Sequence, residues 1–290
     1  MGQIGLMVCN PLPQSDAYAK TLRAFGTDVT CDMIGDHGRC MIQSRQLPVL
    51  GRVNLISRGP IGLGPQDALD YLQTRKVDGP LIVNSNDIHT PIRGFIRLAS
   101  PKSAALLALT CPDTMRANLH QKWRHALTRA EQSRLGIDQM PYHPDQHSWL
   151  IKAERKQQTA RRYRNWPSPL LNQYATTNPG QARVFTAREG KTAIAAMLFL
   201  SHHPWATYHI GFTTPTGRAM NAHHLLLWRA MLWLSKRGYD TLDLGLLTGP
   251  AGLDRFKLRT GARAHPMGGT WLRLPRLQFP SIHVPSGQKA

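Results

Sequence analysis

The pattern of apolar and polar positions is most regular between residues 182 and 245. Alternating or continuous apolar runs bounded by turn residues are typical of strands, and a longer run that is apolar almost all round is typical of a buried helix. The predicted elements are, in order, strands at 182–187, 192–201 and 206–212, a helix at 222–237 and a strand at 239–244. Consecutive strands followed by a helix and a further strand predict an α/β fold, a mixed sheet flanked by helices.

A fainter version of the same order occupies the N-terminal half. Its predicted elements are a helix at 16–25, strands at 39–45 and 52–57, a helix at 65–75 and a strand at 80–83. Because the two halves share an order of elements, though not a sequence, we expect two similar lobes in tandem.

A single amphipathic helix is predicted between the halves, at 113–134. Asp113 can cap its start, its apolar stripe includes Trp123 and Leu127, and Gly136 follows its end. We therefore expect four regions: an N-terminal lobe at 1–112, a basic linking helix at 113–137, a C-terminal lobe at 138–275 and a loosely ordered tail at 276–290.

The start of the helix at 222–237 is a candidate anion site. A helix entered from a loop directly after a strand exposes unpaired backbone N–H groups at the positive end of its dipole. The residues nearest this point are Gly217, Arg218 and Asn221. We predict that they bind an anionic donor.

The charge balance points to anionic partners. The chain carries 36 Lys and Arg side chains against 17 Asp and Glu, a net charge of +19. Residues 1–112 hold 11 basic and 8 acidic side chains, whereas residues 113–290 hold 25 and 9. Such a half would attract RNA, a nucleotide, a phosphorylated lipid carrier or an anionic membrane face. A solvated basic surface explains the charge equally well. The candidate basic patch comprises Lys122, Arg124, Arg129, Arg161 and Arg162.

Neither the four cysteines nor the 13 histidines form a metal or nucleophile motif, because CxxC and HExxH spacings are absent. We expect no bound metal. The first ten residues lack a basic segment followed by a long apolar one, and no apolar run approaches the ~20 residues of a membrane-spanning helix. We expect a cytoplasmic protein, with a charge compatible with peripheral contact at the inner membrane face.

Three segments together resemble the FemABX-like branch of the GNAT superfamily. Residues 118–137 (NLHQKWRHALTRAEQSRLGI) are similar to that family's basic helix, which ends before a Gly. Residues 223–245 (HHLLLWRAMLWLSKRGYDTLDLG) are similar to its leucine-tryptophan helix and the aspartate-bearing strand that follows. Residues 252–262 (GLDRFKLRTGA) resemble its closing Gly-x-x-x-Phe-Lys-x-x-x-Gly signature. The resemblance spans roughly residues 110–265, and the N-terminal half resembles the family only in layout.

This resemblance implies two GNAT-like folds side by side, the N-terminal one degenerate, in a bacterial N-acyltransferase. Members transfer amino acids from charged tRNA to peptidoglycan precursors, and shorter relatives are treated as N-acyltransferases that use acyl-CoA. The resemblance implies acyl-CoA or aminoacyl-tRNA as co-substrate, no tightly bound cofactor, and an amine-bearing acceptor such as a cell-envelope precursor. Phe256 and Lys257 would lie at the acyl-transfer centre, where the Lys257 ammonium stabilises the developing oxyanion.

The donor and the general base stay open. The CoA-binding loop of ordinary GNATs is present only as a remnant at 216–219, which together with the basicity favours tRNA, whereas the short chain favours CoA. Asp243 and His209 are candidate bases for the attacking amine, with a structural role as the alternative for both. The alternative from another class is a non-catalytic RNA-binding or membrane-surface protein on a degenerate GNAT scaffold.

Overall fold

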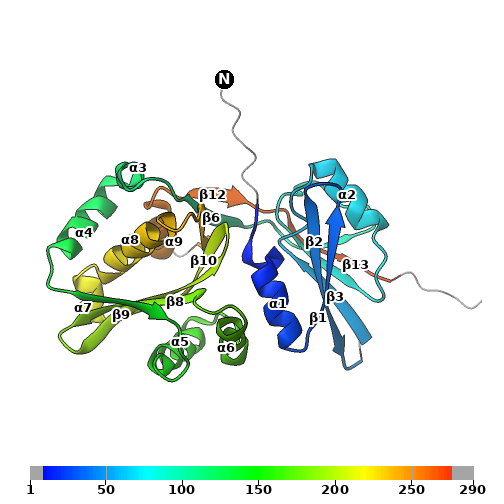
Figure 1. The fold of residues 1–290 in the computed structure, drawn as a ribbon. Coiled ribbons are helices and arrows are strands. Elements are labelled where there is room, and N and C mark those ends of the chain that lie inside the picture. The colour runs from blue at the N-terminus through cyan, green and yellow to red at the C-terminus, as the bar shows by residue number, and fades with distance from the viewer. Residues whose placement is uncertain (1–8, 50, 250, 276–290) are drawn as a thin grey trace, which may run out of the picture.

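The computed structural model describes residues 9–49, 51–249 and 251–275, which form two lobes lying side by side, each built on one mixed β-sheet (Figure 1). The predicted tail at 276–290 lies outside the described residues. Within them, the first sheet has the spatial order β1 (Asp28–Ile34), β2 (Gly38–Leu47), β3 (Gly51–Ser57), β4 (Leu81–Ser85), β13 (Gly269–Arg273), β5 (Ile96–Ala99). The second has the order β12 (Arg263–Pro266), β6 (Ser103–Ala108), β11 (Thr241–Leu246), β10 (Trp205–Thr213), β9 (Thr192–His202), β8 (Ala182–Glu189), β7 (Gly136–Pro141).

Helices fill the spaces between and outside these sheets. In chain order they are the 3-10 helix η1 (Leu12–Gln14), α1 (Asp16–Ala24), α2 (Pro65–Thr74), α3 (Pro112–Asn118), α4 (Gln121–Glu131), α5 (Ser148–Arg161), α6 (Ser168–Thr177), α7 (Pro215–Ala219), α8 (Ala222–Ser235) and α9 (Ala251–Leu258). The elements predicted between 182 and 245 are confirmed as β8, β9, β10, α8 and β11. Those of the N-terminal half are confirmed as α1, β2, β3, α2 and β4.

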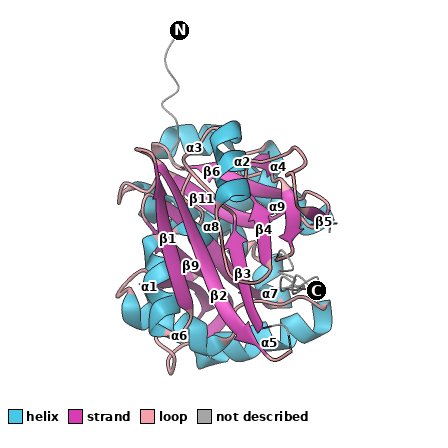
Figure 2. Ribbon diagram, turned by 90° about the vertical axis from the view of Figure 1, so that its right-hand side faces the viewer, coloured by secondary structure: helices cyan, strands magenta, loops and turns pink. Residues whose placement is uncertain are grey.

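Three apolar cores hold the helices against the two sheets. Helix α2 packs on the outer face of the first sheet, and α4 and α8 pack on the outer face of the second. Between the sheets, α1 of the first lobe and α6 of the second share one core with Met41 on β2 and Leu198 on β9. Figure 2 looks onto the first lobe, with β1, β2 and β3 in front of the second sheet. The two lobes are therefore joined by a continuous buried core rather than by a linker.

The lobes also exchange strands. Strand β6 follows β5 in the chain but lies in the second sheet, between β12 and β11. In return, β13 follows β12 but lies in the first sheet, between β4 and β5. The division between the sheets thus differs from the boundary expected at residue 112, because the second sheet already includes β6 and the first takes its last strand from the C-terminal end.

The two lobes repeat one arrangement. In the first, β2 and β3 are antiparallel, α2 follows, and β4 returns parallel to β3. In the second, β9 and β10 are antiparallel, α7 and α8 follow, and β11 returns parallel to β10. This repeat is the tandem pattern expected from the order of elements.

The prediction of a single helix at 113–134 is wrong in one respect. The structure divides this segment into α3 and α4, with the break at Leu119 and His120. The backbone N–H of His120 donates to the carbonyl of Arg259 at 2.9 Å, which draws the chain out of helical geometry. Arg124 donates to the carbonyls of Ala117 and Leu119, pairing the freed end of α3.

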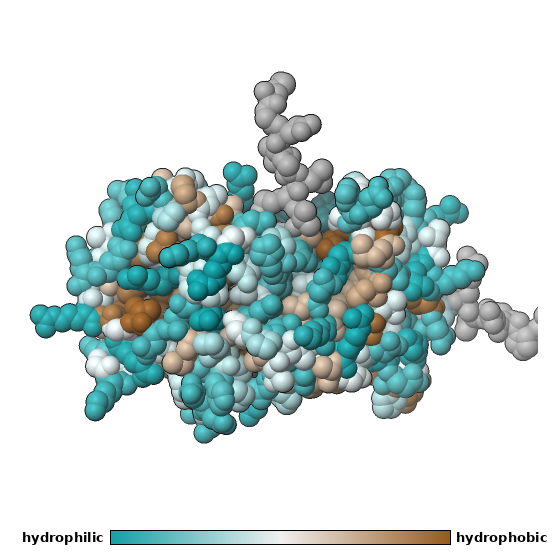
Figure 3. All heavy atoms as spheres, in the orientation of Figure 1, coloured by the Kyte–Doolittle hydropathy of each residue, from teal (hydrophilic) through white to brown (hydrophobic). Residues whose placement is uncertain are grey.

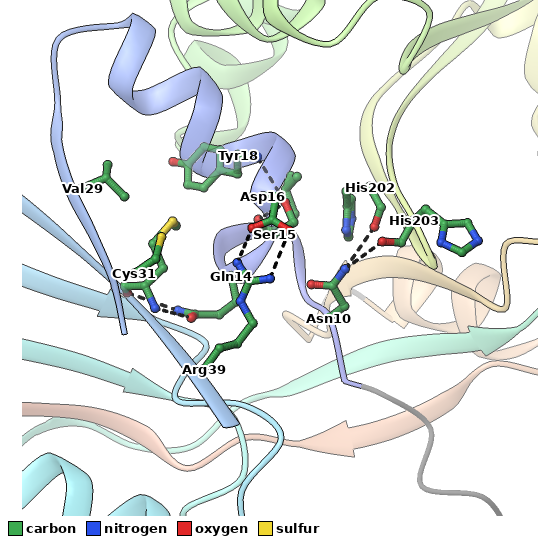
Figure 4. A network of polar contacts seen from close by, with 12 residues as sticks. Asn10, Gln14, Ser15, Asp16, Tyr18, Val29, Cys31, Arg39, His202 and His203 are labelled. Atoms are coloured by element: carbon green, nitrogen blue, oxygen red, sulfur yellow. Dashed lines mark hydrogen bonds and ion pairs between the residues drawn. The ribbon is translucent and has the colours of Figure 1, made fainter. Parts of the chain in front are cut away.

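A buried glutamine fastens the N-terminal segment to the first sheet (Figure 4). Gln14 Oε1 accepts the backbone N–H of Met41 at 2.7 Å, and Gln14 Nε2 donates to the carbonyl of Ser57 at 2.8 Å. The Gln14 amide therefore pairs the Met41 N–H and the Ser57 C=O at the point where β2 and β3 stop pairing with each other. A Cβ at Gly59 would lie 2.6 Å from Gln14 Nε2, so this position accepts only glycine without a shift.

We expect Gln14→Ala to lower the free energy of unfolding by about 2–4 kcal/mol, because it leaves the buried Met41 N–H and Ser57 C=O without partners. Chemical denaturation measures this. Gln66→Ala, at an exposed position on α2, is the matched control and should change stability by no more than about 0.5 kcal/mol. Equal effects of the two substitutions would contradict the proposed anchoring role.

Candidate functional site

Strand ends from both lobes meet at the interface. Because β3 and β4 are parallel, Arg58 after β3 and Asn86 after β4 emerge at the same end of the first sheet. Opposite them lies Asp243 on β11 of the second sheet. Strands β10 and β11 pair only from Trp205 to Thr207 with Thr241 to Asp243, so Asp243 stands where the two strands begin to separate.

A buried ion pair joins the two lobes at this point. Arg58 Nη1 donates to Asp243 Oδ2, and the two side chains are 15% and 3% exposed. Arg58 Nε donates to Asn86 Oδ1 at 3.1 Å, and Asp243 Oδ1 accepts the backbone N–H of Gly245 at 2.7 Å. Asp243 is thus buried and paired with a guanidinium, which favours a positioning role over proton abstraction. Arg58 Nη2 is buried without a partner within the described part of the chain.

Lys257 lies beside this pair. Its side chain projects from α9 and is 5% exposed, and Nζ donates to the carbonyl of Leu246 at 2.8 Å. Burial lowers the pKa of Lys257, and the nearby carboxylates of Asp254 and Asp243 oppose this. Gly245 has a φ of +80°, and a Cβ built there would be 3.8 Å from Lys257 Nζ. The ammonium thus lies at the end of β11, where the strand leaves β10.

Phe256 points in a different direction from its neighbour Lys257. Its ring packs against Trp123, His223 and His224, with centroid separations of 6.0, 6.4 and 5.1 Å. Adjacent residues on a helix diverge by about 100°, so one reaches the core between α4 and α8 while the other reaches β11. The structure therefore gives Phe256 packing contacts, which a structural role would explain.

A second polar group at the interface was not predicted from the sequence. His265 on β12 lies 3.2 Å from Asp87 Oδ1, and Asn86 Nδ2 donates to both Asp87 oxygens at 2.9 Å. Burial raises the pKa of Asp87, but the hydrogen bonds from His265 and Asn86 outweigh it, so the net pKa is lowered and the carboxylate is ionised. Cys9 lies against Asn86, and burial raises the pKa of its thiol to about 12. Asp87 and His265 belong to no short sequence motif, which is why they are not predicted from the sequence.

Burial favours the neutral form of two histidines of the second sheet, His202 and His209. Burial lowers the pKa of His202 to about 3, even though Asp243 acts in the opposite direction. Burial also lowers the pKa of His209, the alternative base candidate, to about 4, and its ring contacts Trp166 edge-on. His202 Nε2 lies 2.9 Å from Thr207 Oγ1, whereas Nδ1 is buried without a partner among the described residues.

The predicted anion site keeps part of its expected geometry. Asn221 precedes α8, and the N–H groups of Ala222 and His223 have no hydrogen-bond partner within the described residues. The Arg218 side chain is exposed nearby. The N–H of Gly217, however, donates to Thr214 Oγ1, and a Cβ there would lie 2.4 Å from the Ile194 carbonyl. Gly217 is thus explained by packing, and Arg218 with the start of α8 stay a predicted donor site.

The five residues of the candidate basic patch come from two helices that pack on opposite faces of the second sheet. Lys122, Arg124 and Arg129 lie on α4, which packs with α8 on the outer face of the second sheet. Arg161 and Arg162 lie at the end of α5, which packs on the opposite face. The second sheet separates the two groups.

Comparison with known proteins places this geometry in a family. Residues 114–258 match the family model described as the acetyltransferase (GNAT) domain. No curated protein matches. No helix among the described residues is long and apolar enough to cross a membrane.

Solved structures resemble both lobes together. FemX matches with a TM-score of 0.70 and 12% identity, over 90% of this chain and 91% of that one. The C-terminal domain of a putative lysylphosphatidylglycerol synthetase from Agrobacterium fabrum has a TM-score of 0.58 and 16% identity, over 91% and 88%. A tandem GNAT protein from the clavulanic acid biosynthesis pathway has a TM-score of 0.53 and 11% identity, over 92% and 90%. These likenesses show a fold of two GNAT-like lobes.

We expect Arg58→Ala to destabilise the protein by about 3–5 kcal/mol, because it leaves the Asp243 carboxylate buried without its cation. The exposed pair Arg52–Asp28 provides the matched control, and Arg52→Ala should cost less than about 1 kcal/mol. Denaturant unfolding of both variants tests this. The double variant Arg58→Met/Asp243→Leu should recover much of the loss, and failure of all three expectations would remove the ion pair as the link between the lobes.

Proposed function

The chain belongs to the GNAT acetyltransferase family, and from this premise we propose that it is an N-acyltransferase that passes an acyl or aminoacyl group directly from an activated donor to an amine. The observation that carries the proposal is the buried Lys257 ammonium at the end of β11, held next to the Arg58–Asp243 pair. Lys257 also lies within the segment that matches the GNAT domain.

Direct transfer assigns a clear task to Lys257. The amine nitrogen attacks the acyl carbon, a tetrahedral intermediate forms, and the bond between the acyl carbon and the sulfur or oxygen of the donor breaks. Negative charge on the acyl oxygen is stabilised by an N–H donor that is already in place in a water-poor site. Lys257 Nζ donates one hydrogen bond to Leu246, which orients it and leaves further N–H groups for that oxygen.

The attacking amine must also lose a proton. The Asp87–His265 pair fits this task better than Asp243, which is buried in its ion pair with Arg58. His265 and Asp87 are 31% and 48% exposed, so a substrate amine can approach them. In this scheme the ionised Asp87 orients the imidazole and His265 takes the proton.

Two donors fit the surface. Acyl-CoA is supported by the free N–H groups at the start of α8 and by the Arg218 side chain near them, where a pyrophosphate would be stabilised. Aminoacyl-tRNA is supported by the net charge of +19 and by the capped N–H of Gly217, which weakens the remnant CoA loop. The proposed acceptor is an amine-bearing molecule such as a cell-envelope precursor.

Native mass spectrometry of the purified protein, before and after ribonuclease and with added acetyl-CoA, separates the donors. A stoichiometric CoA adduct is expected for an acyl-CoA enzyme. A ribonuclease-sensitive adduct in the tRNA mass range, with no CoA bound, is expected for an aminoacyl-tRNA enzyme. RNA binding without transfer from any activated donor would instead support the non-catalytic alternative.

We expect Lys257→Ala to lower the transfer rate by about 100- to 1000-fold, because one preorganised oxyanion donor is lost. Lys152→Ala, at an exposed position on α5, is the control and should leave the rate unchanged. Steady-state kinetics with the donor found above measures both. A rate that survives Lys257→Ala would remove Lys257 from the mechanism.

The pH profile gives an independent check. The protonated form of Lys257 is the active one, and its pKa is lowered by burial, so activity should fall as pH rises, at a lower pH than for a solvent-exposed lysine. Lys257→Arg keeps its charge at higher pH and should move this alkaline decline upward. An identical decline in both proteins would mean that another group titrates.

A further inference from the structure

A groove lies between the C-terminal half of α8 and strands β7 and β8, and none of its lining residues belongs to the transfer centre. Its volume is about 630 Å³. Ile137, Phe185 and Leu232 provide apolar surface, and Trp233 stands over them. The rim carries Arg229, Lys236 and Arg237. An apolar groove with a cationic rim suits a ligand that is part anionic and part apolar.

Two guanidinium groups stack on Trp233, that of Arg237 from the lining of the groove and that of Arg183 from beside the lining residues Trp233 and Gln139. The Cζ atoms of Arg183 and Arg237 lie 4.7 and 4.1 Å from the centroid of Trp233. With the Gln139 amide assigned so that its oxygen faces the groove, Oε1 accepts from Trp233 Nε1 at 2.6 Å and from Arg183 Nη1 at 3.1 Å. The ring and one guanidinium are therefore fixed before any ligand arrives.

The positive charge around Trp233 lacks a counterion. Within the described residues, Arg183, Arg229, Lys236 and Arg237 form no ion pair with a carboxylate. Arg183 Nε is also buried without a partner there. Burial and the proximity of Arg237 both lower the pKa of Arg183, as expected when like charges approach in a partly buried place.

Strands β7 and β8 do contain a paired arginine, so on these strands the lack of a carboxylate partner is confined to the surroundings of Trp233. Arg188 on β8 is paired with Asp138 on β7 at 2.5 Å. Glu131 accepts two hydrogen bonds from Arg116, at 2.9 and 2.8 Å, which lower its pKa most, and it lies close enough to Arg229 for that charge to lower its pKa further. Arginines brought together on one aromatic ring without an acid are best stabilised by an anion that accepts hydrogen bonds from both.

We propose that this groove is a binding site for a phosphorylated small molecule, with its phosphate held by Arg183 and Arg237 and its apolar part resting on Ile137, Phe185 and Leu232. The site is separate from acyl transfer. Phe185, which is 2% exposed, is the most deeply buried of these apolar residues.

Isothermal titration calorimetry of the full chain with phenyl phosphate and with inorganic phosphate tests the site. We expect saturable one-site binding of phenyl phosphate, about tenfold tighter than that of inorganic phosphate, because the phenyl ring adds apolar contact. Arg237→Gln and Arg183→Gln should each weaken phenyl phosphate binding at least about tenfold. Arg93→Gln removes an equal charge from the first lobe and should leave binding unchanged.

If Arg183→Gln disturbs folding, Arg237→Gln still tests the site. Arg237 is exposed, and replacing it removes no buried contact other than its stacking on Trp233. Absence of saturable binding, or an equal effect of Arg93→Gln, would overturn the proposal. So would binding that is confined to single-stranded RNA or to anionic vesicles, because the groove would then serve a macromolecular surface. Transfer activity should not change in Arg237→Gln, which distinguishes failure of this site from failure of the proposed function.

Discussion

A buried charge must be paired, and in this protein the partners come from different lobes. Asp243 on β11 is almost fully enclosed, and its cation, Arg58, follows β3 of the other sheet. Moving the two strand ends apart would leave both charges buried and unpaired, which costs several kcal/mol. Asn86 and Gly245 complete the pair by hydrogen bonding Arg58 and Asp243. The position of Lys257, beside Gly245, therefore depends on a contact that the first lobe supplies.

The chain crosses between the two sheets twice, after β5 and after β12. Strand β6 places residues from the first half of the chain next to β11, and β13 places the C-terminal end next to β4. Helices α1 and α6 add a shared apolar core between the sheets. Among the described residues every strand pair lies within one sheet, so the contacts that oppose hinge motion between the lobes include this shared core and the Arg58–Asp243 pair. The transfer centre that we propose draws residues from both lobes, and these contacts supply the preorganisation that stabilising a transient oxyanion requires.

The basic residues that produce the net positive charge are distributed over several parts of the structure. Few carboxylates are available, and two of them, Asp243 and Asp87, are used at the interface between the lobes. The basic residues of α4 and α5 lie on opposite faces of the second sheet. On Trp233, Arg183 and Arg237 form no ion pair with a carboxylate among the described residues. Charge counted along the chain indicates anionic partners, but only the fold shows at which places an anion would be held.

The sequence by itself determined the elements whose signal is local. Apolar periodicity predicted β8, β9, β10, α8 and β11, because each pattern depends on neighbours a few residues apart, and the Phe-Lys signature marked Lys257. Only the tertiary structure decided the rest. The break between α3 and α4 depends on the carbonyl of Arg259, and the return of β13 depends on pairing with a strand nearly 200 residues earlier. Arg58, Asp87 and His265 stand apart in the chain, and they meet at the interface through long-range strand pairing, which no short segment encodes.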